Sequence, residues 1–335
     1  MATNMEVKTS PAQRNDISVK QSAGQILWTS PNMPNEVSSG SVEDECKKAG
    51  INIEHIQKLR QWLDTQPHLP SEFITDLEII LAYHSCNRNS EVTKQVLDLQ
   101  FTLRTLFTTF FKDRRVDDAR VLKALDVTLS LPLEMRAYDN SAVSYHRLID
   151  YDAKKFVLAD VLRALVMITD LWQHCSGTWP SYIIIIDLEG ITLSHLAKLD
   201  VILVQQYLYY LQEAMFVKLK QLHFLNAPSF MDKLLMIIKP FLKRELLDSL
   251  IIHRVGSRTI EQYLPLEALP KESGGHFKTY KEAREDTIAN LRANEEFFAM
   301  ESKKRVVESL RPGKPKCITD FFGGIEGSFK KLDID

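Results

Sequence analysis

The side chains that could do chemistry in this chain are dispersed and form no known catalytic pattern. His84 and Cys86 come nearest to a metal-binding pair, and no two further ligands follow at a zinc-site spacing. Asp187 and Glu189 lie two residues apart at the end of an apolar run, where we interpret Asp187 as a turn or helix-cap acceptor. The phosphate-loop, nucleophile-elbow, dinucleotide and zinc-protease motifs are absent. The sequence therefore predicts no enzyme, no catalytic residue, no metal site and no cofactor.

An apolar surface that is too wide for an ordinary surface helix spans residues 230–242. A helix on one side of a soluble domain needs only an apolar stripe, whereas here apolar residues cover most of the circumference. The segment is either a deeply buried helix or a lid whose inner face lines a cavity and whose outer face meets lipid. Pro240 should kink or restart this helix, which we predict over residues 230–250.

Basic side chains are concentrated in the same part of the chain. Between residues 218 and 244 the sequence has six cations and one acid, Asp232. Cations between Phe, Met and Leu residues suit an anionic membrane surface. Each cation near such a surface contributes ~1 kcal/mol to the binding free energy. The alternative is a solvated rim that Glu245 and Asp248 balance. The cations are Lys218, Lys220, Lys233, Lys239, Lys243 and Arg244.

The composition restricts the classes of protein that remain. The 335 residues are 44% hydrophobic and carry a net charge of −2, which argues against global disorder and against non-specific nucleic-acid binding. The four cysteines lie far apart and are typical of reduced thiols in a cytosolic protein. The first residues lack an apolar segment, and the run at 182–186 is too short to span a bilayer. We expect a cytoplasmic monomer that contacts membranes transiently and binds no nucleic acid.

Apolar periodicity predicts two kinds of region. Up to about residue 125 the spacing is helical, with breaks at Pro67 and Pro70, and we expect three helices, the second capped by Ser71. Further along, helices alternate with fully apolar strands, which implies an α/β layer with right-handed crossovers. The expected strands are 182–187 and 218–225, and the expected helices are 51–63, 71–84, 90–111, 152–174, 195–215, 230–250 and 280–310.

Four regions follow from these patterns. Residues 1–45 are rich in Ser, Asn and Pro and are predicted to be a disordered tail. Residues 50–125 are the helical unit, and residues 126–276 are the α/β unit. Residues 277–335 are a charged helical extension, followed by a tail that contains the sequences RPGKPK and GSFKKLDID.

Short motifs in the α/β unit are similar to those of one family. DLEG at 187–190 followed by Ser-His, Asn-Ala-Pro at 226–228 and IKPFL at 238–242 match its signatures at the same spacing. LPKESGG at 269–275 is similar to its C-terminal segment. Over residues 50–280 the chain resembles the CRAL-TRIO lipid-binding family, in the branch of alpha-tocopherol transfer protein, retinaldehyde-binding protein and the clavesins.

The resemblance implies a bowl built on a five-stranded, mostly parallel sheet with a helical gate, preceded by a small three-helix domain. It also implies intracellular binding of one small hydrophobic ligand, such as tocopherol, a retinoid or a similar lipid, and its transfer between membranes. On this basis we assign the cavity wall and gate to Ile184, Ile186, Phe224, Phe230, Leu234, Ile237, Ile238 and Phe241. Phosphoinositides or other anionic lipids would bind a basic rim that comprises Lys218, Lys220, Lys239, Lys243 and Arg244.

Two departures from the family pattern affect this basic rim. Glu245 and Ser249 stand where relatives place basic residues, and residues 79–86 lack the arginines of the family's usual LLRFLRAR segment. The phosphoinositide site is therefore incomplete, and Lys243 and Arg244 are the residues that would compensate. The alternative function is a membrane- or protein-docking module with a collapsed pocket and no transfer activity.

Overall fold

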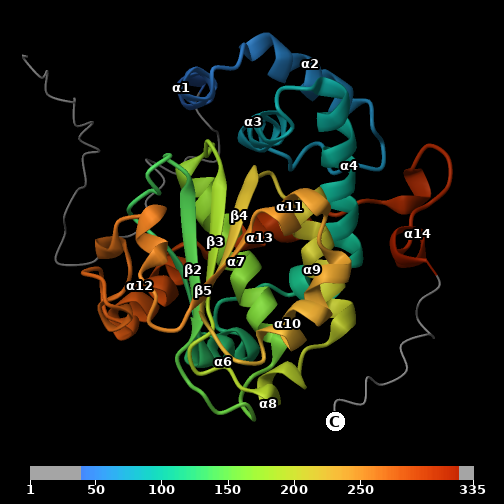
Figure 1. Cartoon of the computed structure of the whole chain (residues 1–335). Coiled ribbons are helices and arrows are strands. Elements are labelled where there is room, and N and C mark those ends of the chain that lie inside the picture. Colours follow the sequence, from blue (N-terminus) through green and yellow to red (C-terminus); the bar gives the residue numbers. More distant parts are fainter. Residues whose placement is uncertain (1–38, 324–335) are drawn as a thin grey trace, which may run out of the picture.

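The computed structural model describes residues 39–323, which contain a five-stranded sheet in the order β1-β2-β3-β4-β5 (Figure 1). β1 runs antiparallel to β2, and the other neighbouring strands are parallel. The predicted α/β class with a mostly parallel sheet is thereby confirmed. The strands are β1 Thr128–Pro132, β2 Ala142–Leu148, β3 Tyr182–Asp187, β4 Leu219–Ala227 and β5 Leu250–Arg254.

The two faces of the sheet belong to different hydrophobic cores. Strand β3 is buried on both faces, which is why its sequence is apolar without interruption. Ile184 packs into the core on one side, whereas Ile183 and Ile185 pack into the core on the other. β1 and β2 are not among the predicted strands, although polar residues such as Ser130 alternate with leucines along β1, which is a pattern typical of a strand.

The N-terminal region is helical, as predicted. Thr75 and Glu78 begin its third helix with a capping box, since each side chain accepts a hydrogen bond from the other residue's N–H. The prediction that Ser71 caps this helix is wrong, because Ser71 lies in a turn before it and its carbonyl accepts from Arg60. The helices are α1 Ser39–Ala49, α2 Ile53–Asp64, α3 Asp76–Ser85, α4 Ser90–Leu106, α5 Thr108–Phe111 and α6 Ala119–Val127.

Helix α1 corrects the predicted boundary of the tail. It begins at Ser39, so residues 39–45 are helical and the predicted disorder is wrong there. Val42, Cys46 and Ala49 fall at helical spacing and are buried in the core of the N-terminal helices. The rest of the predicted tail, and the GSFKKLDID segment, lie outside the described residues.

Two helix boundaries differ from those that periodicity predicts. The carboxylate of Asp152 accepts from the N–H of Lys154, and the helix predicted from residue 152 begins only at Leu158. The carboxylate of Asp200 caps a new helix inside the segment predicted as one helix over 195–215. The resulting helices are α7 Leu158–Ser176, α8 Leu193–Leu196 and α9 Val201–Glu213.

The helix predicted over 230–250 is interrupted at Pro240, as expected. A short 3₁₀ turn, Lys239–Phe241, separates α10 Met231–Ile238 from α11 Arg244–Asp248. The ring of Pro240 has no N–H to donate and opposes continuation of the α-helix. α10 is therefore a separate two-turn helix, and the α-helical conformation ends at its C-terminal residue.

The C-terminal extension packs against the face of the sheet to which Ile183 and Ile185 belong. Ala283 lies in the same core as Leu129 and Ile185, and Figure 1 shows α12 beside the sheet, away from α9 and α10. Phe297 and Phe298 pack in a further core shared by α6 and α7. The extension comprises α12 Tyr280–Ala293, α13 Glu295–Lys303 and α14 Ile318–Phe322.

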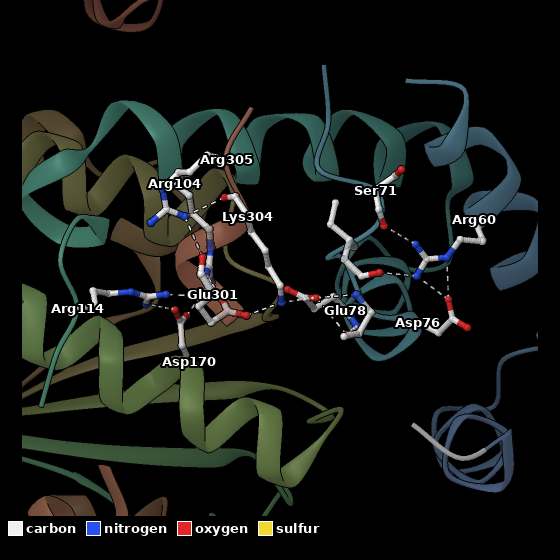
Figure 2. Close-up of polar contacts among 12 residues, drawn as sticks. Arg60, Ser71, Asp76, Glu78, Arg104, Arg114, Asp170, Glu301, Lys304 and Arg305 are labelled. Carbon is white, nitrogen blue, oxygen red and sulfur yellow. Dashed lines mark hydrogen bonds and ion pairs between the residues drawn. The ribbon is translucent and has the colours of Figure 1, made fainter. Parts of the chain in front are cut away.

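A buried cluster of charges links the N-terminal helices to α7 and also to α13 (Figure 2). The Glu301 carboxylate is ion-paired with Arg104 and Lys304. The carboxylate of Asp170 on α7 lies 3.0 Å from Arg104 and 2.5 Å from Arg114. Burial alone would raise the pKa of Glu301, but these neighbouring cations hold that pKa well below its usual range.

Replacing Glu301 should destabilise the whole fold. A Glu301→Gln variant leaves Arg104 and Lys304 buried without their shared counter-charge, and loss of one partner from a buried ion pair costs about 3–5 kcal/mol. We expect the unfolding free energy in urea to fall by this amount. Glu285→Gln, which changes an exposed carboxylate on α12, is the control and should alter it by less than ~0.5 kcal/mol. An equally small effect of Glu301→Gln would contradict the assigned role.

Candidate functional site

An apolar cavity of about 250 Å³ lies between one face of the sheet and the helices α7, α9 and α10. Its floor consists of alternate residues of the strands, since side chains of a strand point to opposite faces in turn. The volume is near the lower limit of ~300–1,000 Å³ for small-molecule sites. The helices contribute Leu158, Val161, Leu162, Leu165, Val204, Tyr207, Leu208, Leu211, Leu234 and Ile238.

Five of the predicted cavity and gate residues line this cavity. They are Ile184, Ile186, Phe224, Leu234 and Ile238, from β3, β4 and α10.

The other three predicted residues, Phe230, Ile237 and Phe241, are half-buried against the same core but do not line the cavity. Met236, on the same short helix, has 69% of its surface exposed. Helix α10 thus presents apolar side chains both to the cavity and to the outside. These three positions remain predicted as gate residues on the basis of their place around α10.

The prediction from the sequence missed part of the cavity wall. The α7 residues follow a helical stripe that is visible in the sequence, although periodicity does not tell which of two cores a stripe faces. The polar part of the wall had a weaker signal, the alternation of Ser144 and His146 along β2. It comprises Thr128, Ser130, His146 and His195.

His146 is held in the wall by a chain of hydroxyl groups. Its Nε2 lies 2.8 Å from the Ser144 hydroxyl, which lies 2.6 Å from the hydroxyl of Tyr182. Burial lowers the pKa of His146 to about 4, so the imidazole is neutral near pH 7. Burial likewise raises the pKa of Tyr182 to about 12.

Asp187 organises the carboxyl end of β3 beside the cavity. Its carboxylate accepts from the Glu189 N–H at 3.0 Å, the turn contact that the sequence predicts. It also accepts from the Tyr145 hydroxyl at 2.5 Å and from the Asn226 amide at 2.8 Å. Arg147 lies 3.2 Å away, so the negative charge is balanced. Asp187 therefore joins three neighbouring strands.

Comparison with known proteins identifies this unit. A family model described as "CRAL/TRIO domain" matches residues 129–275, and one described as "Pinta-like, UBA domain" matches residues 51–121. Residues 129–275 are a CRAL/TRIO domain. The predicted family is confirmed, and membership supports binding of a small lipophilic ligand by this domain.

The relatives of the CRAL/TRIO domain include clavesins. Clavesin-1 from Xenopus laevis is 25% identical over 230 residues, which are 67% of this chain and 68% of that protein. Clavesin-1 from Rattus norvegicus is 25% identical over 258 residues, 73% and 72% of the two chains. Clavesin-2 from Homo sapiens is 23% identical over 230 residues, 67% and 69% of the two chains. The crystal structure of Sfh5 aligns with a TM-score of 0.43 at 14% identity, covering 77% of this chain and 98% of that one.

The predicted basic rim of the CRAL/TRIO domain is only partly gathered in space. Lys220 and Lys243 line one surface pocket of about 560 Å³ together with Glu245. Lys220 is ion-paired with Asp139, and the Lys243 ammonium lies 2.5 Å from the Glu213 carboxylate.

The remaining rim residues lie outside this pocket. Lys218 is half-buried, and burial lowers its pKa, with a further contribution from Arg88. Lys239 is exposed, and Arg244 forms an exposed pair with Asp248 at 3.7 Å. Within residues 39–323, no helix has the length and apolar content needed to cross a membrane.

The unfolding free energy should decrease in weak acid because of His146. Between its ordinary pKa of about 6.5 and the folded value of about 4, the unfolded chain binds a proton that the folded chain excludes. Stability contributed by the neutral imidazole is therefore complete above the unfolded pKa and declines as pH falls, by at most ~1.4 kcal/mol per pH unit. Urea titrations from pH 7 to 4.5 should show a shallower decline for His146→Gln. Leu211→Met, an uncharged change in the same wall, should retain the original slope.

Proposed function

We propose that the chain binds one small hydrophobic ligand, such as tocopherol, a retinoid or a similar lipid, in the cavity and transfers it between membranes. The single observation that carries this proposal is the apolar cavity between the sheet and α7, α9 and α10. Moving a lipid from a bilayer into water costs ~0.8 kcal/mol for each exposed methylene group. An apolar wall removes most of that cost while the ligand crosses the aqueous phase.

Helix α10 is the gate in this proposal. Leu234 and Ile238 close the cavity from inside, while the exposed Met236 is available to enter lipid. The interruption at Pro240 lets α10 move without extending or bending α11. Residues at the ends of short elements commonly absorb such motions.

Anionic headgroups, phosphoinositides among them, would bind the pocket that Lys220 and Lys243 line. Both lysines face acidic partners, so a headgroup must compete with Asp139 and Glu213 for them. We propose that this docking is transient and that the protein acts in the cytoplasm as a monomer without enzymatic activity. The competing carboxylates favour weak, reversible docking, as a carrier needs.

The second candidate is a docking module without cargo. It would require a pocket filled by its own side chains, and the open volume beside His146 and Ile186 favours the carrier instead.

Lipid uptake tests the carrier function. After incubation with phosphatidylcholine vesicles that contain α-tocopherol or retinal, native mass spectrometry should find one lipid molecule per chain. Ile186→Trp fills the cavity and should reduce the occupied fraction at least fivefold. Ile252→Trp adds the same ring at an exposed position outside the cavity and should leave occupancy unchanged. Wild-type protein that stays empty with every lipid would reject the carrier and favour the docking module.

Charge reversal tests membrane docking. Lys220→Glu combined with Lys243→Glu should weaken sedimentation with vesicles containing phosphatidylinositol bisphosphate at least tenfold, since each cation contributes ~1 kcal/mol. Lys47→Glu with Lys281→Glu makes the same change in charge at two exposed sites far from the pocket along the chain. Equal losses in both double variants would indicate a general charge effect and remove the assigned pocket.

A further inference from the structure

The short helix α14 bridges two helices that belong to different parts of the molecule. Its Phe322 stacks on Phe107, the residue that ends α4, with 6.0 Å between the ring centroids. The same ring packs edge-to-face on Tyr209 of α9 at 5.3 Å, and Phe321 lies 6.1 Å from Tyr209. Figure 1 shows α14 on the outer side of α4 and α9. Because α9 lines the cavity, α14 contacts one cavity wall from the outside.

The segment that leads to α14 is fixed to α4 by polar contacts. The Arg311 guanidinium donates to the Asp98 carboxylate at 2.7 Å and to the Thr102 hydroxyl at 2.7 Å. The Lys316 ammonium lies 3.0 Å from the same carboxylate. Asp98 and Thr102 are one turn apart on α4, so these contacts hold the segment along that helix.

Helix α14 itself is attached to α9 only through aromatic rings. Within residues 39–323, its hydrogen bonds run to its own residues, to Cys317 and to Lys314, which lies 3.1 Å from Asp320. Phe321 and Phe322 are half-buried. Apolar contacts are non-directional and can be broken without leaving a buried polar group unpaired. The helix can therefore leave α9 while the preceding segment stays on α4.

The part of α9 that α14 covers adjoins the contacts between α9 and the end of the gate helix. Gln212 lies three residues after Tyr209, which makes the two side chains neighbours on the helix surface. The Gln212 amide donates to the Phe241 carbonyl at 2.9 Å and accepts from the Lys243 N–H at 2.7 Å. Phe241 and Lys243 follow α10 directly. A displacement of the last turn of α9 is thus transmitted to the C-terminal end of α10.

Other contacts limit how far α9 can move. Tyr207 packs edge-to-face on Phe110 at 6.3 Å, and Tyr210 packs on Phe111 at 5.0 Å. These contacts join α9 to α5 and do not involve α14. Loss of α14 from its site should consequently loosen the outer side of α9 without releasing the whole helix.

We propose that α14 is a clasp that keeps the cavity closed. Docked on Phe107 and Tyr209, it restrains the last turns of α9 and, through Gln212, the end of α10, and its detachment favours opening and release of the ligand. This inference rests on the proposed carrier function and adds the regulation of the same site. Two aromatic pairs shift a docking equilibrium by about tenfold, so a minority of molecules with α14 detached coexists with the closed form.

Amide hydrogen exchange of the full chain without ligand tests the restraint. Phe321→Ala combined with Phe322→Ala removes the rings that α14 places on α9, and peptides covering 205–213 and 239–243 should exchange at least threefold faster, since exchange reports local opening. Phe73→Ala with Phe277→Ala removes two other half-buried phenyl rings and should leave these peptides unchanged. Circular dichroism melting curves check that both double variants are folded.

Ligand release tests the consequence for the cavity. Protein loaded with radiolabelled α-tocopherol is mixed with excess phosphatidylcholine vesicles, and the label that stays with the protein is counted after the vesicles are sedimented at successive times. The Phe321→Ala, Phe322→Ala variant should release the label at least threefold faster than the wild type and the control. Tyr209→Leu removes the receiving ring on α9 while α14 stays intact, and it should accelerate release in the same direction.

The outcomes separate the clasp from the carrier function. Unchanged exchange in α9 and in the turn after α10 would overturn the clasp, whether or not the protein carries a lipid. Faster exchange together with an unchanged rate of release would overturn the link between α9 and the gate. Wild-type protein that takes up neither tocopherol nor retinal would reject the carrier, and the exchange measurement would still decide whether α14 restrains α9.

Discussion

The buried carboxylates of Asp170 and Glu301 are the constraint on which the arrangement of the molecule depends. Neither is stable in a protein interior without cations, and those cations come from α4, from the segment after α5 and from the residue that follows α13. Helix α7 is therefore fixed to the N-terminal helices and to the C-terminal extension simultaneously. Because α7 also provides one wall of the cavity, that wall is anchored by charges far apart in the sequence.

The opposite wall is held in a different way. Helix α10 has only eight residues, contacts the core through Leu234, Leu235 and Ile238, and exposes Met236. Apolar contacts are non-directional and tolerate displacement, whereas a network of buried ion pairs does not. One wall of the cavity is therefore held by directional ion pairs, and the other is held by apolar contacts. In the proposed carrier, this asymmetry would let the cavity open on the side of α10.

The sequence was sufficient for the class of fold, the uninterrupted strand β3 and the break at Pro240, because each depends on local chemistry or on full burial. It was insufficient where a side-chain hydrogen bond starts a new helix inside an apolar period, as at Asp200. It also could not place the basic rim, since the partners of Lys220 and Lys243, Asp139 and Glu213, are distant in the chain. Spatial proximity of charges far apart in sequence has no local signature.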